Sequence, residues 1–245
     1  KIKEQGMTTG ENSVSGIKFA ARLAQKLMTY LNTQTRDGRA YEVDMRLRPS
    51  GNAGMMVVSC HAFETYQLEK AWSWEHQALV RARAICGDKR VTARFCYFRR
   101  TVLALPRTIE EVRIEVTSMR IKMQKHLGTS QWQQQAGKFH LKQDAGGVID
   151  IEFLAQFAVL AYSHEHPTLT KWSDNVRIFE EMATLGIWER EICQDLKDAY
   201  LRIRAATHQL ALSEQSLLVD ESLWTETRAL VQAQWQHLMG VESTE

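Results

Sequence analysis

The chain has only three prolines among its 245 residues, and this scarcity constrains the fold more than any other feature. Proline breaks helices, so long helices can form where it is absent. After residue 59, apolar side chains recur mainly at helical spacing and two-residue alternation is rare. We therefore expect a mainly α protein built around a helical bundle, with one weak strand pattern at residues 138–142. Helices are predicted at residues 60–70, 73–86, 89–105, 108–127, 147–164, 174–186, 188–212 and 221–239.

The first 58 residues follow a different pattern. Helical spacing covers residues 15–31. Residues 40–48 alternate polar and apolar side chains, which predicts a β-strand, and residues 55–58 predict a short second strand. So small a set of elements cannot bury a sheet face alone. We therefore predict a small α/β remnant of a sheet domain at residues 1–58, followed by a helical bundle domain at residues 59–245.

Composition narrows the classes of protein. With 44% hydrophobic and 24% charged residues, the chain has the make-up of a soluble globular protein rather than of a disordered or repetitive one. No stretch approaches about 18 consecutive apolar residues, so we expect no membrane span and no membrane partner. The four cysteines lack the spacing of a zinc or redox site, and they predict free thiols in a reducing compartment, the cytoplasm.

The small net charge of +2 conceals an asymmetry along the chain. Residues 81–125 hold twelve Lys or Arg and four acidic residues, whereas residues 187–245 hold five and ten. A basic segment of this kind can face phosphates, but it can equally be the solvated face of neighbouring helices. Because no nucleic-acid-binding motif and no interleaving of basic and aromatic residues accompanies it, we do not expect a nucleic-acid partner.

The alternating segment at residues 40–48 presents four charged side chains on one face. These are Glu42, Asp44, Arg46 and Arg48. A carboxylate suits Mg²⁺ and guanidinium groups suit phosphate oxygens, so such a face suits a site for a metal and a nucleotide. The competing interpretation, which the segment alone favours, is an ordinary amphipathic strand whose surface charges compensate one another.

The predicted helix at residues 147–164 is apolar on nearly every side, so we expect it to be buried at the centre of the bundle. Two glycines and Asp150 stand at its start, where free N–H groups can bind an anion. Glu152 and Gln156 share one face, and a buried carboxylate there needs polar partners. The alternative is structural, with Asp150 completing the helix start and Glu152 tying the bundle together.

Glu75 and Arg81 flank the apolar stripe of the predicted helix at residues 73–86. Both side chains are long enough to reach over the edge of this stripe to a neighbouring element. The segment is otherwise typical of an ordinary packed helix.

Four segments together resemble one enzyme family. The segments are Tyr41–Gly51, Trp74–Arg83, Gly146–Phe153 and Trp172–Ile178. Their order and spacing are similar to those of the glutamate–ammonia ligase (glutamine synthetase) adenylyltransferases, the bifunctional bacterial enzymes also called adenylyl-removing enzymes. The similarity extends from about Ser15 to Met239, which is nearly the whole chain.

Members of this family carry two nucleotidyltransferase halves, each with a DNA-polymerase-β-like sheet followed by a helical bundle. The residue patterns of the second and fourth segments resemble the C-terminal half, which transfers AMP from ATP to a tyrosine of glutamine synthetase. The resemblance therefore implies nucleotidyl transfer, with Mg²⁺ as cofactor, ATP as substrate, and glutamine synthetase and the PII signal protein as partners.

The sequence departs from the family pattern in one respect. In this superfamily an Asp-x-Asp pair that holds two Mg²⁺ ions precedes the third carboxylate, and this chain has no such pair, as if it were an N-terminally truncated fragment. Asp44 matches the third carboxylate, which implies metal coordination or deprotonation of the attacking hydroxyl. Arg46 and Arg48 are the candidates for phosphate contact. Further matches to family motifs, assigned to positioning or inter-domain support, are Glu75, Arg81, Asp150 and Glu152.

Two metal ions held by three carboxylates neutralise the charge in nucleotidyl transfer, whereas one carboxylate does not. We therefore expect that this chain alone does not transfer AMP. The alternative interpretation is a non-catalytic helical module that docks glutamine synthetase, the PII signal protein or the other half of its parent chain.

Overall fold

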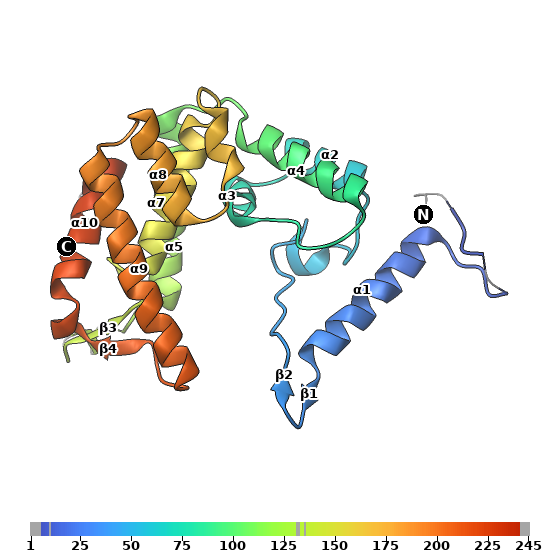
Figure 1. Ribbon diagram of the computed structural model, residues 1–245, viewed down its shortest axis with the longest axis horizontal. Helices are drawn as coiled ribbons and strands as arrows, with labels where there is room; N and C mark the ends of the chain where they lie inside the picture. The colour runs from blue at the N-terminus through green and yellow to red at the C-terminus, as the bar shows by residue number, and fades with distance from the viewer. Residues whose placement is uncertain (1–5, 10, 131–132, 135, 241–245) are drawn as a thin grey trace. The chain divides into compact units, whose positions relative to one another are not determined.

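The computed structural model describes residues 6–9, 11–130, 133–134 and 136–240 (Figure 1). Within these ranges the protein is mainly α, as the sequence predicts, with nine α-helices and two small antiparallel sheets of two strands each. None of the helices in these ranges is both long and apolar enough to cross a lipid bilayer.

The chain divides into two compact units. The first contains residues 1–75 and 86–98, and the second contains residues 76–85 and 99–245. Two helices, α3 (Ser73–Arg81) and α4 (Lys89–Leu103), contribute residues to both units. The division into domains at residue 58, which the sequence predicts, stays a prediction.

The first unit begins with α1 (Gly16–Asn32), whose start is capped by the hydroxyl of Ser15. Its other regular elements are the antiparallel strands β1 (Gln34–Thr35) and β2 (Gly38–Arg39), the 3-10 turn η1 (Gly51–Ala53) and α2 (Cys60–Glu69). The helices predicted at residues 15–31 and 60–70 are confirmed by α1 and α2.

The predicted strand at residues 40–48 is wrong, because this segment is irregular and then turns. A strand must pair its backbone groups with a neighbouring strand. Here Tyr41 and Val43 instead donate their N–H groups to the last turn of α1, at 3.0 and 3.1 Å. The short strand predicted at residues 55–58 is also absent from this part of the described chain.

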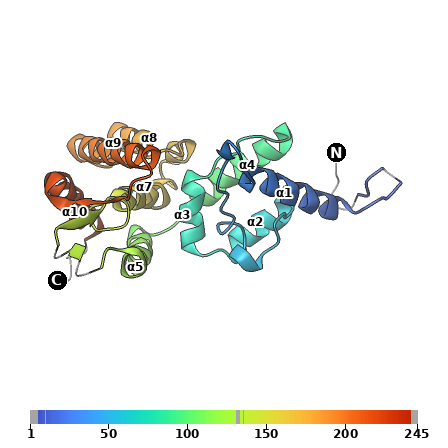
Figure 2. The ribbon, with the colours of Figure 1, turned by 90° about the horizontal axis from the view of Figure 1, so that it is seen from below.

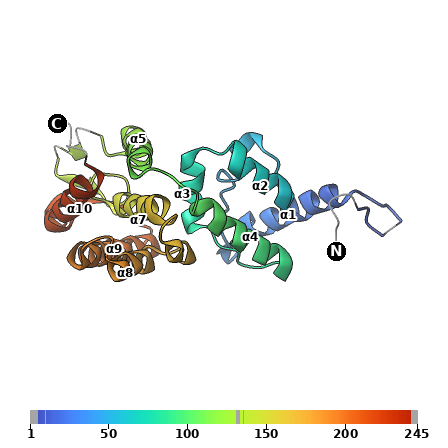
Figure 3. The same ribbon diagram turned by 90° about the horizontal axis from the view of Figure 1, so that it is seen from above.

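The second unit is a helical bundle around α7 (Val148–Tyr162). Only Glu152 and Tyr162 of this helix are not fully buried, which confirms the prediction of a central helix. Helices α5, α8, α9 and α10 all contact it (Figures 2 and 3). The other elements are α5 (Ile109–Leu127), β3 (Lys138–His140), η2 (Pro167–Lys171), α8 (Asn175–Leu185), α9 (Arg190–Leu212), β4 (Leu218–Asp220), η3 (Glu221–Leu223) and α10 (Thr225–Met239).

Aromatic side chains pack beside α7. The Phe157 ring stacks on Trp188 with 6.5 Å between ring centroids, and Trp188 stacks on Phe179 of α8 with 6.3 Å. Each such pair contributes about 0.5–1.5 kcal/mol beyond its buried area. Strand β3 confirms the weak strand pattern, because it pairs with β4 and places Phe139 opposite Val219.

The helix predicted at residues 73–86 ends early, at Arg81. The buried Arg99 guanidinium donates to the carbonyl oxygen of Leu79 at 2.7 Å and also to that of Val80. The carbonyls of a last helical turn lack partners within the helix. Because Arg99 satisfies two of them, α3 can stop in a buried position.

Candidate functional site

Two of the predicted site residues are in direct contact in the segment after α1. The Nε of Arg46 lies 3.0 and 2.9 Å from the two carboxylate oxygens of Asp44, and its Nη2 lies 2.7 Å from Oδ2. The Arg46 side chain, together with its backbone N–H, lowers the pKa of Asp44 to about 2 because these hydrogen bonds stabilise the charged form. Asp44 and Arg46 therefore form an exposed ion pair and not two separate side chains on a sheet face.

Arg48, the second candidate for phosphate contact, closes the loop that follows. Its Nη1 donates to Met45 O at 2.7 Å and its Nε donates to Gly54 O at 3.3 Å. Glycine is required at position 54, because a Cβ atom there would lie 1.9 Å from Pro49 O. The structure therefore gives Arg48 a role in shaping the loop at residues 48–54.

Glu75 is buried and is connected to the same loop by hydrogen bonds. The Tyr66 hydroxyl lies 3.0 and 3.1 Å from the two Glu75 carboxylate oxygens, and the Trp72 N–H donates to Oε2 at 3.0 Å. The Ser50 N–H in turn donates to the Tyr66 hydroxyl at 3.1 Å. A chain of contacts thus runs from Glu75 through Tyr66 to Ser50.

Mg²⁺, which the family resemblance implies, needs several oxygen ligands held close together. In the described ranges no three His, Cys, Asp or Glu side chains are placed to hold a metal ion. Asp44 faces a guanidinium group, and the nearby Glu42 pairs with Arg39 at 3.5 Å. The described residues do not fit a Mg²⁺ site by themselves.

In the second unit, Arg81 and Glu152 form an ion pair that joins α3 to α7. One helical turn away on each helix, Gln77 Nε2 donates to Gln156 Oε1 at 3.3 Å. Glu152 and Gln156 therefore share one face, as predicted, and that face meets α3. The two contacts hold α3 against α7, the central helix of the bundle.

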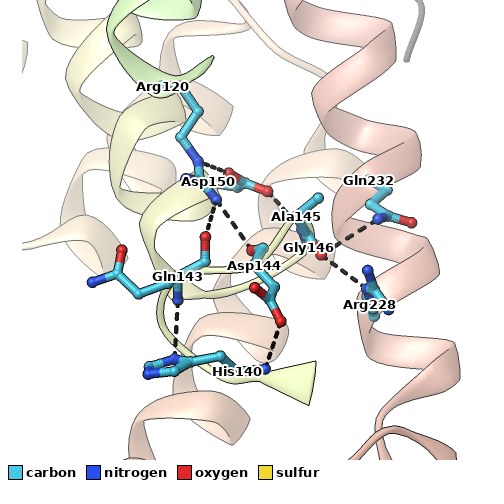
Figure 4. A network of polar contacts seen from close by, with 9 residues as sticks. All are labelled: Arg120, His140, Gln143, Asp144, Ala145, Gly146, Asp150, Arg228 and Gln232. Carbon is cyan, nitrogen blue, oxygen red and sulfur yellow. Dashed lines mark hydrogen bonds and ion pairs between the residues drawn. The ribbon is translucent and has the colours of Figure 1, made fainter. Parts of the chain in front are cut away.

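Arg120 of α5 and Asp150 of α7 form an ion pair in which both side chains are buried (Figure 4). Arg120 Nη2 also donates to the carbonyl oxygens of Gln143 at 2.8 Å and Asp144 at 3.1 Å. The other Asp150 oxygen accepts a hydrogen bond from the Gly146 N–H at 2.6 Å. Burial raises the pKa of Asp150, and the Arg120 guanidinium opposes this rise. The ion pair ties the loop that precedes α7 to α5.

The same loop is held by two further sets of contacts (Figure 4). The Asp144 carboxylate accepts hydrogen bonds from the backbone N–H groups of Thr129 and His140, both at 2.7 Å. Arg228 of α10 donates from Nε to Ala145 O at 3.0 Å. The loop is thereby connected to α10 as well as to α5 and α7.

The start of α7 is not open to an anion, so the anion-binding interpretation is wrong. The N–H groups of Gly146, Gly147 and Val148 donate to acceptors within the chain at 2.6, 2.9 and 2.9 Å. Gly146 has a φ of +82°, and a Cβ atom there would lie 2.6 Å from Arg228 Cγ. The glycine therefore allows close packing, and Asp150 completes the helix start.

Sequence reasoning missed two buried arginines of the basic segment at residues 81–125. Arg99, which ends α3, also donates to Thr170 O at 2.6 Å. Arg120 stands four residues after Val116 on the buried stripe of α5, and this position is the signal that would have revealed it. Because both arginines are buried, the basic segment is not a uniformly solvated face.

Two family models match the chain. Residues 2–97 match the family described as Glutamate-ammonia ligase adenylyltransferase, and residues 117–243 match the family described as GlnD PII-uridylyltransferase. Both descriptions name transferases of nucleotidyl groups, so the two matched regions are similar to parts of proteins of that class.

The bifunctional glutamine synthetase adenylyltransferase/adenylyl-removing enzyme of Acinetobacter baylyi is 52% identical to the chain over 241 residues. The alignment covers 98% of this chain and 26% of the relative, so the chain spans about a quarter of that enzyme's length. The chain belongs to the glutamine synthetase adenylyltransferase family, as its motifs predict, and over residues 117–243 also to the family described by the uridylyltransferase model.

Proposed function

We propose that the protein to which this chain belongs transfers AMP from ATP to a tyrosine of glutamine synthetase, and that the chain is part of the C-terminal, adenylylating half. The observation that carries the proposal is the 52% identity to the Acinetobacter baylyi enzyme across 98% of the chain. The residue patterns of Trp74–Arg83 and Trp172–Ile178 favour the adenylylating half over the adenylyl-removing half. The cytoplasmic location stays a prediction from the free cysteines.

Asp44 is the candidate for the third carboxylate of the reaction centre. Its pKa of about 2 makes it ionised and a weak proton acceptor at neutral pH. We therefore assign Asp44 an electrostatic role toward a cation, which an ionised carboxylate can fill. Mg²⁺ would supply charge neutralisation, but the described residues do not hold it alone, so we propose that the isolated chain does not transfer AMP.

Arg46 is the candidate for direct phosphate contact. Its pair with Asp44 is exposed, and exposed ion pairs are weak enough to exchange partners. Arg48 acts differently, because it bonds to backbone carbonyls and shapes the loop beside Arg46. Its charge adds to the positive potential that a triphosphate would meet there.

Three of the other motif residues act through packing. Asp150 holds the loop before α7, and Arg81 with Glu152 joins α3 to α7. These contacts keep the bundle in one arrangement, so we assign all three residues to positioning and not to chemistry.

The decisive experiment replaces Asp44 in the whole enzyme. Asp44→Asn removes the negative charge with little change in shape, and we expect loss of AMP transfer from radiolabelled ATP to glutamine synthetase. Asp37→Asn, in the exposed turn between β1 and β2, is the matched control and should keep full activity. Retained transfer in Asp44→Asn would remove this carboxylate from the reaction centre.

The isolated 245-residue chain provides a second test. Incubated with glutamine synthetase, ATP and Mg²⁺, it should leave glutamine synthetase unlabelled, while the whole enzyme labels it under the same conditions. Labelling by the isolated chain would show that the described residues are sufficient for catalysis and would overturn this part of the proposal.

A second candidate function is docking of a protein partner by the bundle. The match of residues 117–243 to the PII-uridylyltransferase family favours it, because that region lies in the second unit and holds no described metal cluster. The isolated chain should then bind glutamine synthetase or the PII signal protein in calorimetric titrations. Absence of binding to either protein at about 100 μM, measured at two temperatures so that a zero enthalpy at one of them does not hide it, would exclude an affinity stronger than about 5 kcal/mol.

A further inference from the structure

We infer that Tyr66 and Glu75 are positioning residues for nucleotide binding, because they hold the loop at residues 48–54 in the conformation that places Arg48. The inference rests on the proposed function, since it concerns the segment that we assign to ATP. It goes beyond the motif match, which assigns Glu75 only to positioning or inter-domain support and does not include Tyr66.

The chemistry of the three groups determines the direction of each hydrogen bond. A carboxylate oxygen of Glu75 can only accept, and the backbone N–H of Ser50 can only donate. The Tyr66 hydroxyl, which lies 3.0 Å from Glu75 Oε1 and 3.1 Å from Ser50 N, must therefore donate its single hydrogen to Glu75 and accept from Ser50. One hydroxyl thus transmits the position of a buried carboxylate to an exposed loop.

At the helical end of this series of contacts, hydrogen bonds hold Glu75 in place. Glu75 is 5% exposed, and a buried carboxylate is costly unless donors surround it. Tyr66 on α2 and the Trp72 N–H before α3 are these donors. Because Glu75 depends on the Tyr66 hydroxyl, the orientation of the phenol is fixed by the two helices and not by the loop.

At the other end of the series, the loop needs a stabilising hydrogen bond because of its backbone conformation. Ser50 has a φ of +60° and Gly51 a φ of +52°, so two consecutive residues adopt the left-handed conformation. This conformation is unfavourable for a residue that carries a side chain, such as Ser50. The bond from Ser50 to Tyr66 stabilises it, and the Gly51 N–H then donates to Arg48 O at 2.8 Å. Removal of the Tyr66 hydroxyl therefore releases the backbone on which Arg48 stands.

The kinetic test uses Tyr66→Phe in the whole enzyme. We expect KM for ATP to rise about three- to tenfold, the effect of one hydrogen bond, with kcat at saturating ATP changed less than about twofold. Tyr30→Phe, at an exposed tyrosine of α1, is the control and should leave both constants unchanged. A merely structural role would reduce the amount of folded enzyme and leave KM for ATP unaltered.

Variants of Glu75 add a second comparison. Glu75→Gln keeps a side-chain carbonyl that can accept from Tyr66, whereas Glu75→Ala removes the acceptor. KM for ATP should therefore rise less in Glu75→Gln than in Glu75→Ala. Equal values of KM in wild type and Glu75→Ala would overturn the inference.

Hydrogen–deuterium exchange separates this inference from the proposed function. In the 245-residue chain, a peptide that contains residues 48–54 should exchange faster in Tyr66→Phe than in wild type or Tyr30→Phe. Unchanged exchange overturns the inference whatever the catalytic result, and so does faster exchange with an unchanged KM for ATP. Failure of the proposed function is recognised independently, by full AMP transfer in Asp44→Asn.

Discussion

Arg120 and Asp150 stand 30 residues apart in the sequence and form an ion pair whose side chains are only 3% and 6% exposed. The pair connects α5 to α7 and holds the loop between β3 and α7 through the Gly146 N–H and two backbone carbonyls. The motif Gly146–Phe153 of this enzyme family is therefore a packing element in this chain. The stability of the bundle should depend strongly on the Arg120–Asp150 ion pair.

Replacement of Arg120 tests the buried ion pair. Arg120→Met leaves the Asp150 carboxylate buried without its cation, and we expect a loss of about 3–5 kcal/mol in the free energy of unfolding. Urea denaturation of the 245-residue chain followed by circular dichroism measures it. Lys122→Met, at an exposed position of the same helix, should change the free energy by less than about 0.5 kcal/mol. A loss below about 1 kcal/mol in Arg120→Met would contradict the importance of the pair.

Gly146 and Gly186 separate backbone strain from steric overlap. Both have positive φ angles, +82° and +67°, but a Cβ at Gly146 would lie 2.7 Å from Arg228 O, whereas Gly186 has open space. Gly186→Ala should lower the free energy of unfolding by about 1–2 kcal/mol, because alanine is disfavoured in the left-handed backbone conformation. Gly146→Ala should lower it more, because the backbone of α10 must also move. Equal losses in urea denaturation would show that the approach of Arg228 is not tight.

The environment of His140 leads us to expect that the stability of the chain depends on pH. Its Nδ1 accepts hydrogen bonds from Lys142 N at 3.1 Å and Gln143 N at 3.2 Å, and burial lowers its pKa below the ordinary value of 6.5. As the pH falls, the His140 ring therefore becomes protonated in the unfolded chain before it does so in the folded chain. The contribution of neutral His140 to the free energy of unfolding is complete above pH 6.5 and is lost as the pH falls below that value.

The measurement compares the free energy of unfolding at about pH 7.5 and about pH 5.5. His140→Asn supplies an acceptor that does not titrate, so it should lose less stability on acidification than wild type. His208→Asn, at an exposed histidine, should retain the wild-type dependence. The same dependence in all three proteins would show that His140 is not responsible.

The cysteines should differ in reactivity. Burial raises the pKa of Cys193 to about 11, whereas Cys86 is exposed. The thiolate is the nucleophile, so iodoacetamide at about pH 8 should alkylate Cys86 much faster than Cys193. Mass spectrometry of peptides after timed labelling measures both rates, and urea should remove the difference. Similar rates in the folded chain would contradict the buried position of Cys193.

Periodicity was sufficient to predict most helices. The bounds of α5, α7 and α8 lie within two residues of the predicted ranges. Helical hydrogen bonds join residues four apart, and an apolar stripe repeats over the same distance, so a short window contains the information. The capping box of Thr108 and Glu111 at the start of α5 is equally local.

Strand formation at residues 40–48 could not be decided in the same way. The alternation of side chains there is real, but a strand also needs a neighbour to accept its hydrogen bonds. Tyr41 and Val43 bond to the end of α1, and the Asp44 side chain accepts from the N–H of Arg46 and favours a turn. The partners of Asp44 and Arg46 therefore differ from those that a sheet face would have provided.

The motifs identified the family and the site residues, because they are contiguous stretches of sequence. The partners of these residues are set by contacts between distant positions. Glu152 pairs with Arg81 across 71 positions, and Asp150 pairs with Arg120 across 30. A buried carboxylate requires a cation or other donors, but the chain contains 31 lysines and arginines. The packing of α3 and α5 against α7 selects the two that pair with these carboxylates.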